Sequence, residues 1–185
     1  LPNLLQLFST SQYLSSLLIV DNEAYDLLRI TDGQPVARDS LIEELDQEVA
    51  TLTNKQEVMA SLRRFKRREI LRIAFGDIIR GQTVATVARQ ISYLADAIIE
   101  IAVRFARRSL EELRGEPQGL KGNRARFVVL ALGKLGGVEL NYSSDIDLVF
   151  FYDLDGQTDA ARPISNHEFF IKLGQALIDI LQTPT

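Results

Sequence analysis

The sequence predicts an α+β protein in which an α-helical bundle is followed by a short β-sheet and a closing helix. Apolar residues recur at spacings of three and four through residues 1–114, the period of helices that pack on one another. Residues 115–122 (GEPQGLKG) then place three glycines and a proline in eight residues. Two β-prone runs and one more helical pattern follow, so we expect a helical region over 1–118 and a second domain over 119–185.

Helical periodicity defines three helices, after two or three shorter ones within residues 1–30. The first begins at Asp39 or Ser40, because either side chain can cap a helix whose acidic first turn suits the helix dipole. The second runs from about Lys55 to Arg80, and the third from Thr83 to about Leu113. The side chains expected to face the core are Leu41, Leu45, Val49 and Leu52, then Val58, Leu62, Phe65, Ile73 and Ile78, then Val84, Val87, Ile91, Leu94, Ile98, Ile101 and Phe105.

Composition restricts the kinds of site that the chain can build. It carries 21 basic and 25 acidic residues, a net charge of −4, so its overall field does not favour nucleic acid. The absence of cysteine excludes disulfides and thiolate zinc sites. The one histidine, His167, falls at the expected start of the last helix, and we assign it no role.

The beginning of the chain carries no membrane or export signal. Its longest apolar run, Leu17–Val20, is far shorter than a bilayer span, and no basic region precedes it. We therefore expect a cytoplasmic protein without a membrane partner. The chain also begins without Met, which is typical of a fragment.

The second part of the chain alternates strand and turn signals before its last helix. The β-prone runs are Arg126–Leu132 and Ile146–Tyr152, and a polar loop spans Asp153–Pro163. The closing helix spans Asn166–Gln182. Its apolar face consists of Phe169, Phe170, Leu173, Leu177 and Ile180.

A glycine cluster, Gly133-Lys134-Leu135-Gly136-Gly137, follows the first strand. It lacks the spacing and the Ser or Thr of a Walker A loop. Glycines after a strand can still expose backbone N–H groups to a phosphate, with Lys134 supplying charge. A tight turn with an exposed lysine is the structural alternative.

Two carboxylates one residue apart, Asp145 and Asp147, stand at the start of the second strand. Alternate side chains of a strand share a face, so both carboxylates should point the same way while Ile146 and Leu148 point into a core. Adjacent hard oxygen ligands on a rigid element suit Mg²⁺ beside a phosphate. Paired aspartates at a strand edge can instead oppose aggregation, but the apolar flanks here make unbound charge costly.

Together these residues read GKLGG-x-EL-N-x-SSDIDL over 133–148 and resemble the signature of the glutamine synthetase adenylyltransferase family. These are bifunctional adenylyl-transferring and adenylyl-removing enzymes with two similar halves. More broadly the motif resembles DNA polymerase β-like nucleotidyltransferases, which place a glycine turn before a D-x-D strand. Residues 3–5, 11–18 and 62–73 resemble the helical region that precedes the catalytic core, so the resemblance covers most of the chain. The sequence of residues 141–147 is similar to that of the amino-terminal, adenylyl-removing half.

The resemblance implies that residues 119–185 are the first part of a nucleotidyltransferase-type sheet with its closing helix. It implies that Asp145 and Asp147 are catalytic and hold two Mg²⁺ ions. In the removing half, inorganic phosphate would attack an adenylylated tyrosine of glutamine synthetase and release ADP, whereas the transferring half would use ATP. Glutamine synthetase and a PII-type nitrogen regulatory protein are the implied partners. The candidate nucleotide-binding residues are Gly133, Lys134, Gly136, Gly137, Ser143 and Ser144.

Sites of this family resemble a three-carboxylate design, with the third Asp on a strand that follows the closing helix. This chain stops at Thr185, so we expect that third carboxylate beyond it and predict that these 185 residues alone are catalytically inactive. Asp153, Asp155, Asp159 and Asp179 fall in a loop or a helix, where we expect them to be poor substitutes.

A basic cluster, Arg63 to Arg72, admits two interpretations. Arg64, Arg68 and Arg72 align at i, i+4 and i+8, where like charges repel, so a solvated face partly neutralised by Glu57 and Glu69 is one of them. The other is a surface for an acidic partner or for phosphate, which Arg104, Arg107 and Arg108 would extend.

Three hypotheses for the whole chain remain open. It is a nucleotidyltransferase fragment acting on glutamine synthetase, a module that only binds a nucleotide or a cation, or a helical interaction domain in which D-x-D is incidental.

Overall fold

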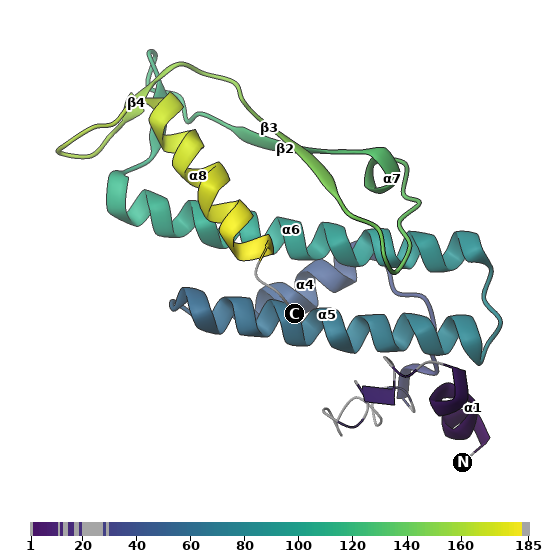
Figure 1. Cartoon of the computed structure of the whole chain (residues 1–185). Helices are drawn as coiled ribbons and strands as arrows, with labels where there is room; N and C mark the ends of the chain where they lie inside the picture. The colour runs from purple at the N-terminus through teal and green to yellow at the C-terminus, as the bar shows by residue number, and fades with distance from the viewer. Residues whose placement is uncertain are drawn as a thin grey trace. The chain divides into compact units, whose positions relative to one another are not determined.

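The computed structural model describes residues 2–10, 12, 15, 16, 19, 28 and 30–182. Helices come first and short strands follow, so the expected α+β class is confirmed (Figure 1). Most of the short helices expected within residues 1–30 fall outside the described residues. The elements in chain order are α1 (Pro2–Thr10), α4 (Arg38–Val49), α5 (Lys55–Ile78), α6 (Val84–Arg114), β1 (Pro117–Gly119), β2 (Phe127–Leu132), α7 (Gly133–Gly136), β3 (Asp147–Tyr152), β4 (Gly156–Thr158) and α8 (Asn166–Leu181).

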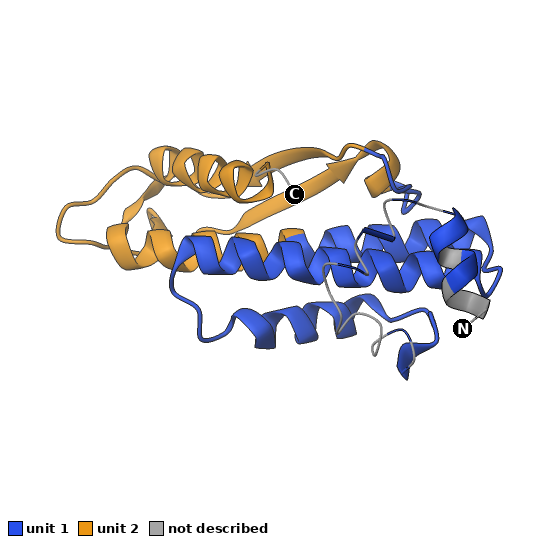
Figure 2. Ribbon diagram, turned by 60° about the horizontal axis from the view of Figure 1, so that its bottom comes forward, with its two compact units in different colours: residues 1–98, 137–144 blue, residues 99–136, 145–185 orange. Residues whose placement is uncertain are grey.

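The chain divides into two compact units, which Figure 2 shows in different colours. The helical unit contains residues 1–98 and 137–144, and the sheet unit contains residues 99–136 and 145–185. Helix α6 contributes residues to both. The boundary that we expect between residues 118 and 119 falls within β1, and as a domain boundary it stays a prediction.

In the helical unit, α5 and the first part of α6 run antiparallel (Figure 1). Asn54 caps α5 by accepting a hydrogen bond from the Gln56 N–H. Helix α4 begins at Arg38, before both expected cap residues, and its N-cap, Ala37, offers no side-chain bond, so the expected cap at Asp39 or Ser40 is wrong. Most of the expected inward-facing residues are buried. The exceptions are Leu52, Ile78 and Ile98, which are half-buried, and Val84, which is exposed.

The basic cluster is not a solvated face throughout, because Arg72 is only 1% exposed. Its guanidinium lies 2.7 Å from the Glu69 carboxylate, which is buried too. It also donates to the Gln34 carbonyl oxygen at 2.5 Å and to Gln90 Oε1 at 2.9 Å. Such a pair withstands burial only because hydrogen bonds occupy the remaining donors. Arg72 is therefore a core residue.

Arg68 is neutralised by the neighbouring helix α4. It donates to Glu44 at 2.5 Å and to Glu48 at 2.8 Å, whereas we had expected Glu57 to contribute. The other four basic residues are exposed or half-buried, and in the described part of the chain they form no ion pair: Arg63, Arg64, Lys66 and Arg67. The cluster thus separates into a structural pair and a smaller basic surface.

In the sheet unit, β2 and β3 form an antiparallel hairpin whose register runs from Phe127 opposite Tyr152 to Leu132 opposite Asp147. One face packs on α8, where the Phe170 ring stacks 5.6 Å from that of Phe127 and 4.9 Å from that of Tyr152. The other face carries Val128, Leu130, Leu132 and Phe151, each about half exposed. The expected face of α8 is buried, and Ser165 caps that helix by accepting from the Glu168 N–H.

A second antiparallel pair, β1 with β4, joins two segments that we expected to be loops. Gln118 lies opposite Gln157, and the bridge continues to Gly119 opposite Gly156. Asn166, which is fully buried, donates to the carbonyl oxygens of Gln118 and Leu154. These long-range bonds satisfy polar backbone that short glycine-containing segments could not satisfy locally.

Among the described helices, none combines the length and the apolar character needed to cross a bilayer.

Candidate active site

The residues of the GKLGG…SSDID motif are divided between the two units. Gly133, Lys134, Gly136, Asp145 and Asp147 belong to the sheet unit. The connecting segment 137–144, with Gly137, Ser143 and Ser144, belongs to the helical unit. The chain thus crosses between the units twice within the motif.

Within the sheet unit, the hairpin register places Gly133 beside Asp147. Asp147 begins β3 opposite Leu132, the last residue of β2, and Gly133 follows directly. A Cβ added to Gly133 would lie 3.6 Å from Asp147 Oδ2, an ordinary contact. The glycine is required by its backbone, because its φ of +55° lies in the left-handed region.

Asp145 and Ile146 precede the strand, since β3 begins only at Asp147. Ile146 is 36% exposed and Leu148 half-buried, so the expectation that Ile146 points into a core is wrong. The carboxylates of Asp145 and Asp147 are exposed, and within the described residues neither makes a hydrogen bond or an ion pair. Their oxygens are free to act as hard ligands, which suits Mg²⁺.

The glycine cluster forms a single helical turn, α7, in place of the expected glycine turn. Leu135 is buried, whereas Lys134 is exposed and has no partner among the described residues. A Cβ on Gly136 would come within 2.6 Å of the Ala131 carbonyl oxygen. Gly136 therefore has a packing reason of its own, the close approach of α7 to β2.

The serines of the motif are organised by Asn141. Its Oδ1 accepts from the Ser143 N–H at 3.1 Å and from the Ser144 hydroxyl at 2.8 Å. The Asn141 carbonyl oxygen also accepts from the Ser144 N–H at 3.2 Å. This is the Asx-turn chemistry that Asn two residues before Ser favours, and it was the available sequence signal for Asn141.

Sequence reasoning missed the anchors that hold this loop within the helical unit. The Leu140 N–H donates to Ser92 Oγ of α6 at 3.1 Å, and both residues are almost fully buried. The Tyr142 hydroxyl donates to Asp77 Oδ2 of α5 at 3.2 Å. Partial burial and then the Asp77 carboxylate raise the pKa of Tyr142 above its usual value. No local pattern marks Ser92 or Asp77, because their partners lie about fifty residues or more away.

Two other aspartates of the sheet unit already have structural partners. Asp153 accepts from the Arg126 N–H at 2.7 Å and from Arg126 Nε at 2.8 Å. Asp159 accepts from the Glu116 N–H at 2.7 Å and from Gln118 at 3.1 Å. Across the described ranges, no three acidic or histidine side chains gather as a metal-binding group.

The whole chain, residues 1–185, matches the glutamate-ammonia ligase adenylyltransferase family. The chain belongs to this family. The resemblance seen in the GKLGG…SSDID motif is thereby confirmed.

Three relatives share one name, bifunctional glutamine synthetase adenylyltransferase/adenylyl-removing enzyme. The protein of Pseudomonas aeruginosa is 42% identical over 82% of this chain and 16% of its own length. That of Thioalkalivibrio sulfidiphilus is 39% identical over 83% of this chain and 15% of its own length. That of Nitrosomonas eutropha is 35% identical over 95% and 19%. The chain thus spans less than a fifth of these family members.

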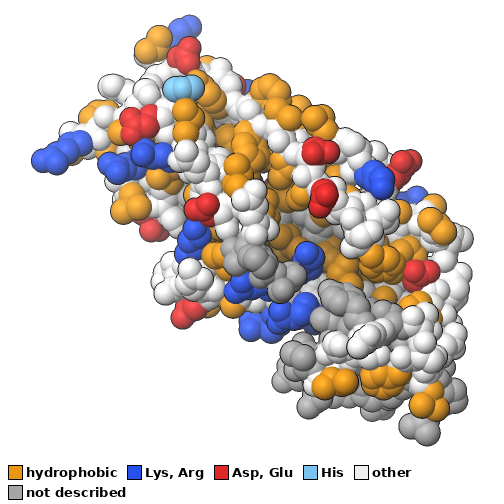
Figure 3. Space-filling view, viewed as in Figure 1, with side chains coloured by type: hydrophobic (Ala, Val, Ile, Leu, Met, Phe, Trp, Pro, Cys, Tyr) orange, Lys and Arg blue, Asp and Glu red, His pale blue; other side chains and the backbone are white. Residues whose placement is uncertain are grey.

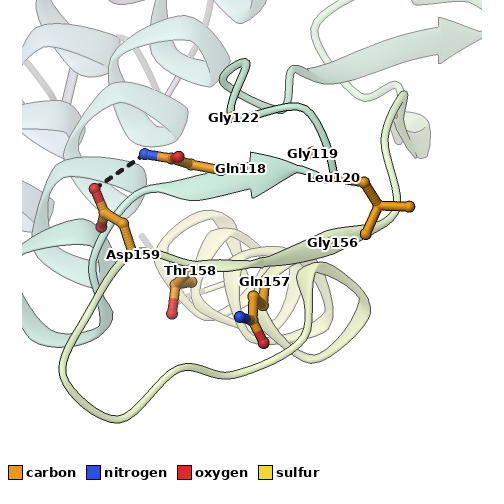
Figure 4. Close-up of a pocket in the computed structure, with 8 residues that line it drawn as sticks. All are labelled: Gln118, Gly119, Leu120, Gly122, Gly156, Gln157, Thr158 and Asp159. Atoms are coloured by element: carbon orange, nitrogen blue, oxygen red, sulfur yellow. Dashed lines mark hydrogen bonds between the residues drawn. The ribbon is translucent and has the colours of Figure 1, made fainter.

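A hollow outside the family motif lies in the sheet unit. This hollow of about 630 Å³ lies along β1 and β4, with Gln118, Leu120, Gln157 and Asp159 among its lining (Figure 4). Figure 4 shows Gln118 directed at Asp159, so these two polar groups already satisfy each other. His167 is exposed, and Figure 3 shows this histidine in pale blue at the surface.

Proposed function

We propose that residues 133–147 form the nucleotide- and metal-binding part of a nucleotidyltransferase site that acts on a tyrosine of glutamine synthetase. The observation that carries this proposal is a pair of exposed carboxylates, Asp145 and Asp147, that have no partner among the described residues and lie within the motif of this family. Carboxylates left exposed and without a cation of the protein are available to a metal. The names of the relatives supply the reaction class.

We further infer that the reaction removes the adenylyl group from glutamine synthetase, as the similarity of residues 141–147 to the adenylyl-removing half implies. An oxygen of hydrogen phosphate forms a bond to the adenylyl phosphorus while the bond from phosphorus to the tyrosine oxygen breaks. The products are ADP and the free tyrosine, whose oxygen takes the proton of hydrogen phosphate. The result would regulate glutamine synthetase and thus nitrogen assimilation.

The residues of the motif would bind and orient the reactants. Asp145 and Asp147 would hold two Mg²⁺ ions, which supply charge neutralisation at the phosphates. The hydroxyls of Ser143 and Ser144 and the exposed ammonium of Lys134 would contact phosphate oxygens. Catalysis of this kind depends on positioning and charge and needs no side-chain nucleophile.

Partners and location follow from the family resemblance. Glutamine synthetase is the proposed protein substrate, and a PII-type nitrogen regulatory protein is a proposed regulator. A cytoplasmic location, without nucleic acid or membrane partners, stays a prediction from the composition.

Titration of the 185-residue chain with Mg-ADP in a calorimeter tests the proposal. Asp145→Asn and Asp147→Asn should each weaken binding at least about tenfold, since each removes a ligand charge. Asp155→Asn, which alters another exposed aspartate of the same unit, is the matched control and should bind like the unchanged chain. Equal affinity in all four proteins would favour a helical interaction domain instead.

The 185 residues alone should not catalyse the reaction, because the motif supplies two carboxylates where the resemblance implies three. Incubation with adenylylated glutamine synthetase, Mg²⁺ and phosphate should release no ADP. Release of ADP that disappears in Asp145→Asn would overturn the proposed inactivity while leaving the proposed site intact.

A further inference from the structure

The loop that carries the two serines is built into the helical unit and not into the hairpin that carries the aspartates (Figure 2). Two contacts anchor it there. At one end, the buried Leu140 N–H donates to Ser92 Oγ, which itself donates to the Ala88 carbonyl oxygen at 2.9 Å. At the other end, the Tyr142 hydroxyl donates to Asp77. The two anchored residues, Leu140 and Tyr142, lie within three residues before Ser143.

The Ser92 contact is costly to lose. Leu140 is 2% exposed and Ser92 is 0% exposed, so water cannot replace the missing acceptor. A buried N–H without a partner carries its full desolvation penalty. The contact therefore fixes the backbone at Leu140.

The loop also contains a strained residue. Val138 has a φ of +59°, a left-handed conformation that is rare for a β-branched side chain. Such strain persists only where the surroundings determine the backbone. Here the Leu140 anchor follows two residues later, so tertiary contacts and not local preference set the path of the loop.

We propose that Ser92, Asp77 and Tyr142 are positioning residues, through which helices α5 and α6 set the conformation of the Asn141–Ser144 loop for nucleotide binding. This inference rests on the proposed function. The anchors are connected to the site through few residues. Asn141, which lies between Leu140 and Tyr142, forms hydrogen bonds with both serines, and Ser144 directly precedes Asp145 in the chain. Packing of the helices in the helical unit would thus influence the position of the two serines.

Two variants each remove one anchor with little change of volume, and a third conserves the second anchor. Ser92→Ala removes the acceptor for Leu140 and places a strong helix former in α6. Tyr142→Phe removes the hydroxyl, and Asp77→Asn keeps an oxygen acceptor for Tyr142. Tyr93→Phe is the matched control, since in the described part of the chain its hydroxyl makes no hydrogen bond. Ser61→Ala is the second control, because it removes a buried hydroxyl that contacts Glu48.

The experiment combines amide hydrogen exchange over residues 138–146 with calorimetric titration of Mg-ADP, both on the 185-residue chain. In Ser92→Ala and Tyr142→Phe, exchange should accelerate in this segment and affinity should fall about two- to tenfold, the effect of one lost hydrogen bond. Asp77→Asn should retain most of the affinity. Both controls should leave local exchange and affinity unchanged.

Two results would overturn the inference. Unchanged exchange in the anchor variants would show that the contacts do not hold the loop. Faster exchange with unchanged affinity would show that the loop conformation does not matter for binding. Failure of the proposed function would look different, because the unchanged chain would then not bind Mg-ADP at all. The inference would fail with it, although hydrogen exchange would still show whether the anchors hold the loop.

Discussion

Helix α5 and the segment 144–147 each carry several charges of one sign, but these charges differ in their surroundings. Arg72 is buried among Glu69, Gln34 and Gln90, and Arg68 is paired with Glu44 and Glu48. Asp145 and Asp147 are exposed and, in the described ranges, have no partner. Charges that stabilise the fold are paired with other groups of the protein, whereas charges without such partners are available to bind a ligand.

The largest effect should come from the buried pair. Arg72→Met should lower the free energy of unfolding by about 3–5 kcal/mol, because it leaves the Glu69 carboxylate buried without its counter-ion. Urea denaturation of the chain measures this. The double variant Arg72→Met with Glu69→Leu should be more stable than Arg72→Met alone, since no buried charge is then unpaired. A single variant as stable as the unchanged chain would contradict the contrast between the two regions.

The motif carboxylates should contribute almost nothing to stability. The double variant Asp145→Asn with Asp147→Asn should change the free energy of unfolding by no more than about 0.5 kcal/mol, as is usual for exposed residues without partners. The same urea experiment applies, with Asp155→Asn as control. A loss well above that of the control would mean that the fold uses these charges after all.

The smallest effect concerns Asp153, an exposed carboxylate that does have a partner. Hydrogen bonds from the Arg126 side chain and then from its backbone hold the pKa of Asp153 below its usual value. Arg126→Gln should raise that pKa towards about 3.9, the value of an unperturbed aspartate. Because the folded pKa is the lower one, the stabilisation is present above about pH 4 and is lost as the pH falls through the folded value.

Carboxyl NMR titration measures the pKa of Asp153, and urea denaturation at pH 7 and near pH 2 measures the accompanying stability. The difference in stability between Arg126→Gln and the unchanged chain should shrink at the lower pH. An unchanged Asp153 pKa in the variant would show that Arg126 is not its effective partner.

The sequence alone predicted the long helices, the β2–β3 strands and α8 because their signals are local. Helical period marks Leu41, Leu45 and Val49, and it marks Phe169 and Leu173 equally well. The motif was recognisable for a similar reason, since its residues lie close together in the chain. The assignment of Gly133, Lys134, Gly136, Gly137, Ser143, Ser144, Asp145 and Asp147 to ligand binding stays a prediction that the titrations above address.

Local signals failed where partners are distant in sequence. The strands β1 and β4 are three residues each, contain glycine, and are paired across about forty residues. The exposure of Ile146 depends on where β3 begins, which the pairing with Leu132 decides. The backbone just before α4 likewise has a distant partner, because Gln90 accepts from the Val36 N–H and donates to the Val36 carbonyl oxygen.

By itself, the sequence determined the long helices, the β2–β3 strands, helix α8 and the family to which the chain belongs, because periodicity and contiguous motifs lie within short stretches. Only the tertiary structure decided which charged side chains are paired and which, among the described residues, have no partner. It also decided that the Asn141–Ser144 loop belongs to the helical unit. The partners of Arg72, Ser92 and Tyr142 lie between 3 and 65 residues away in the chain. Folding brings the distant partners within hydrogen-bond distance, and burial makes the contacts of Arg72 and Ser92 obligatory.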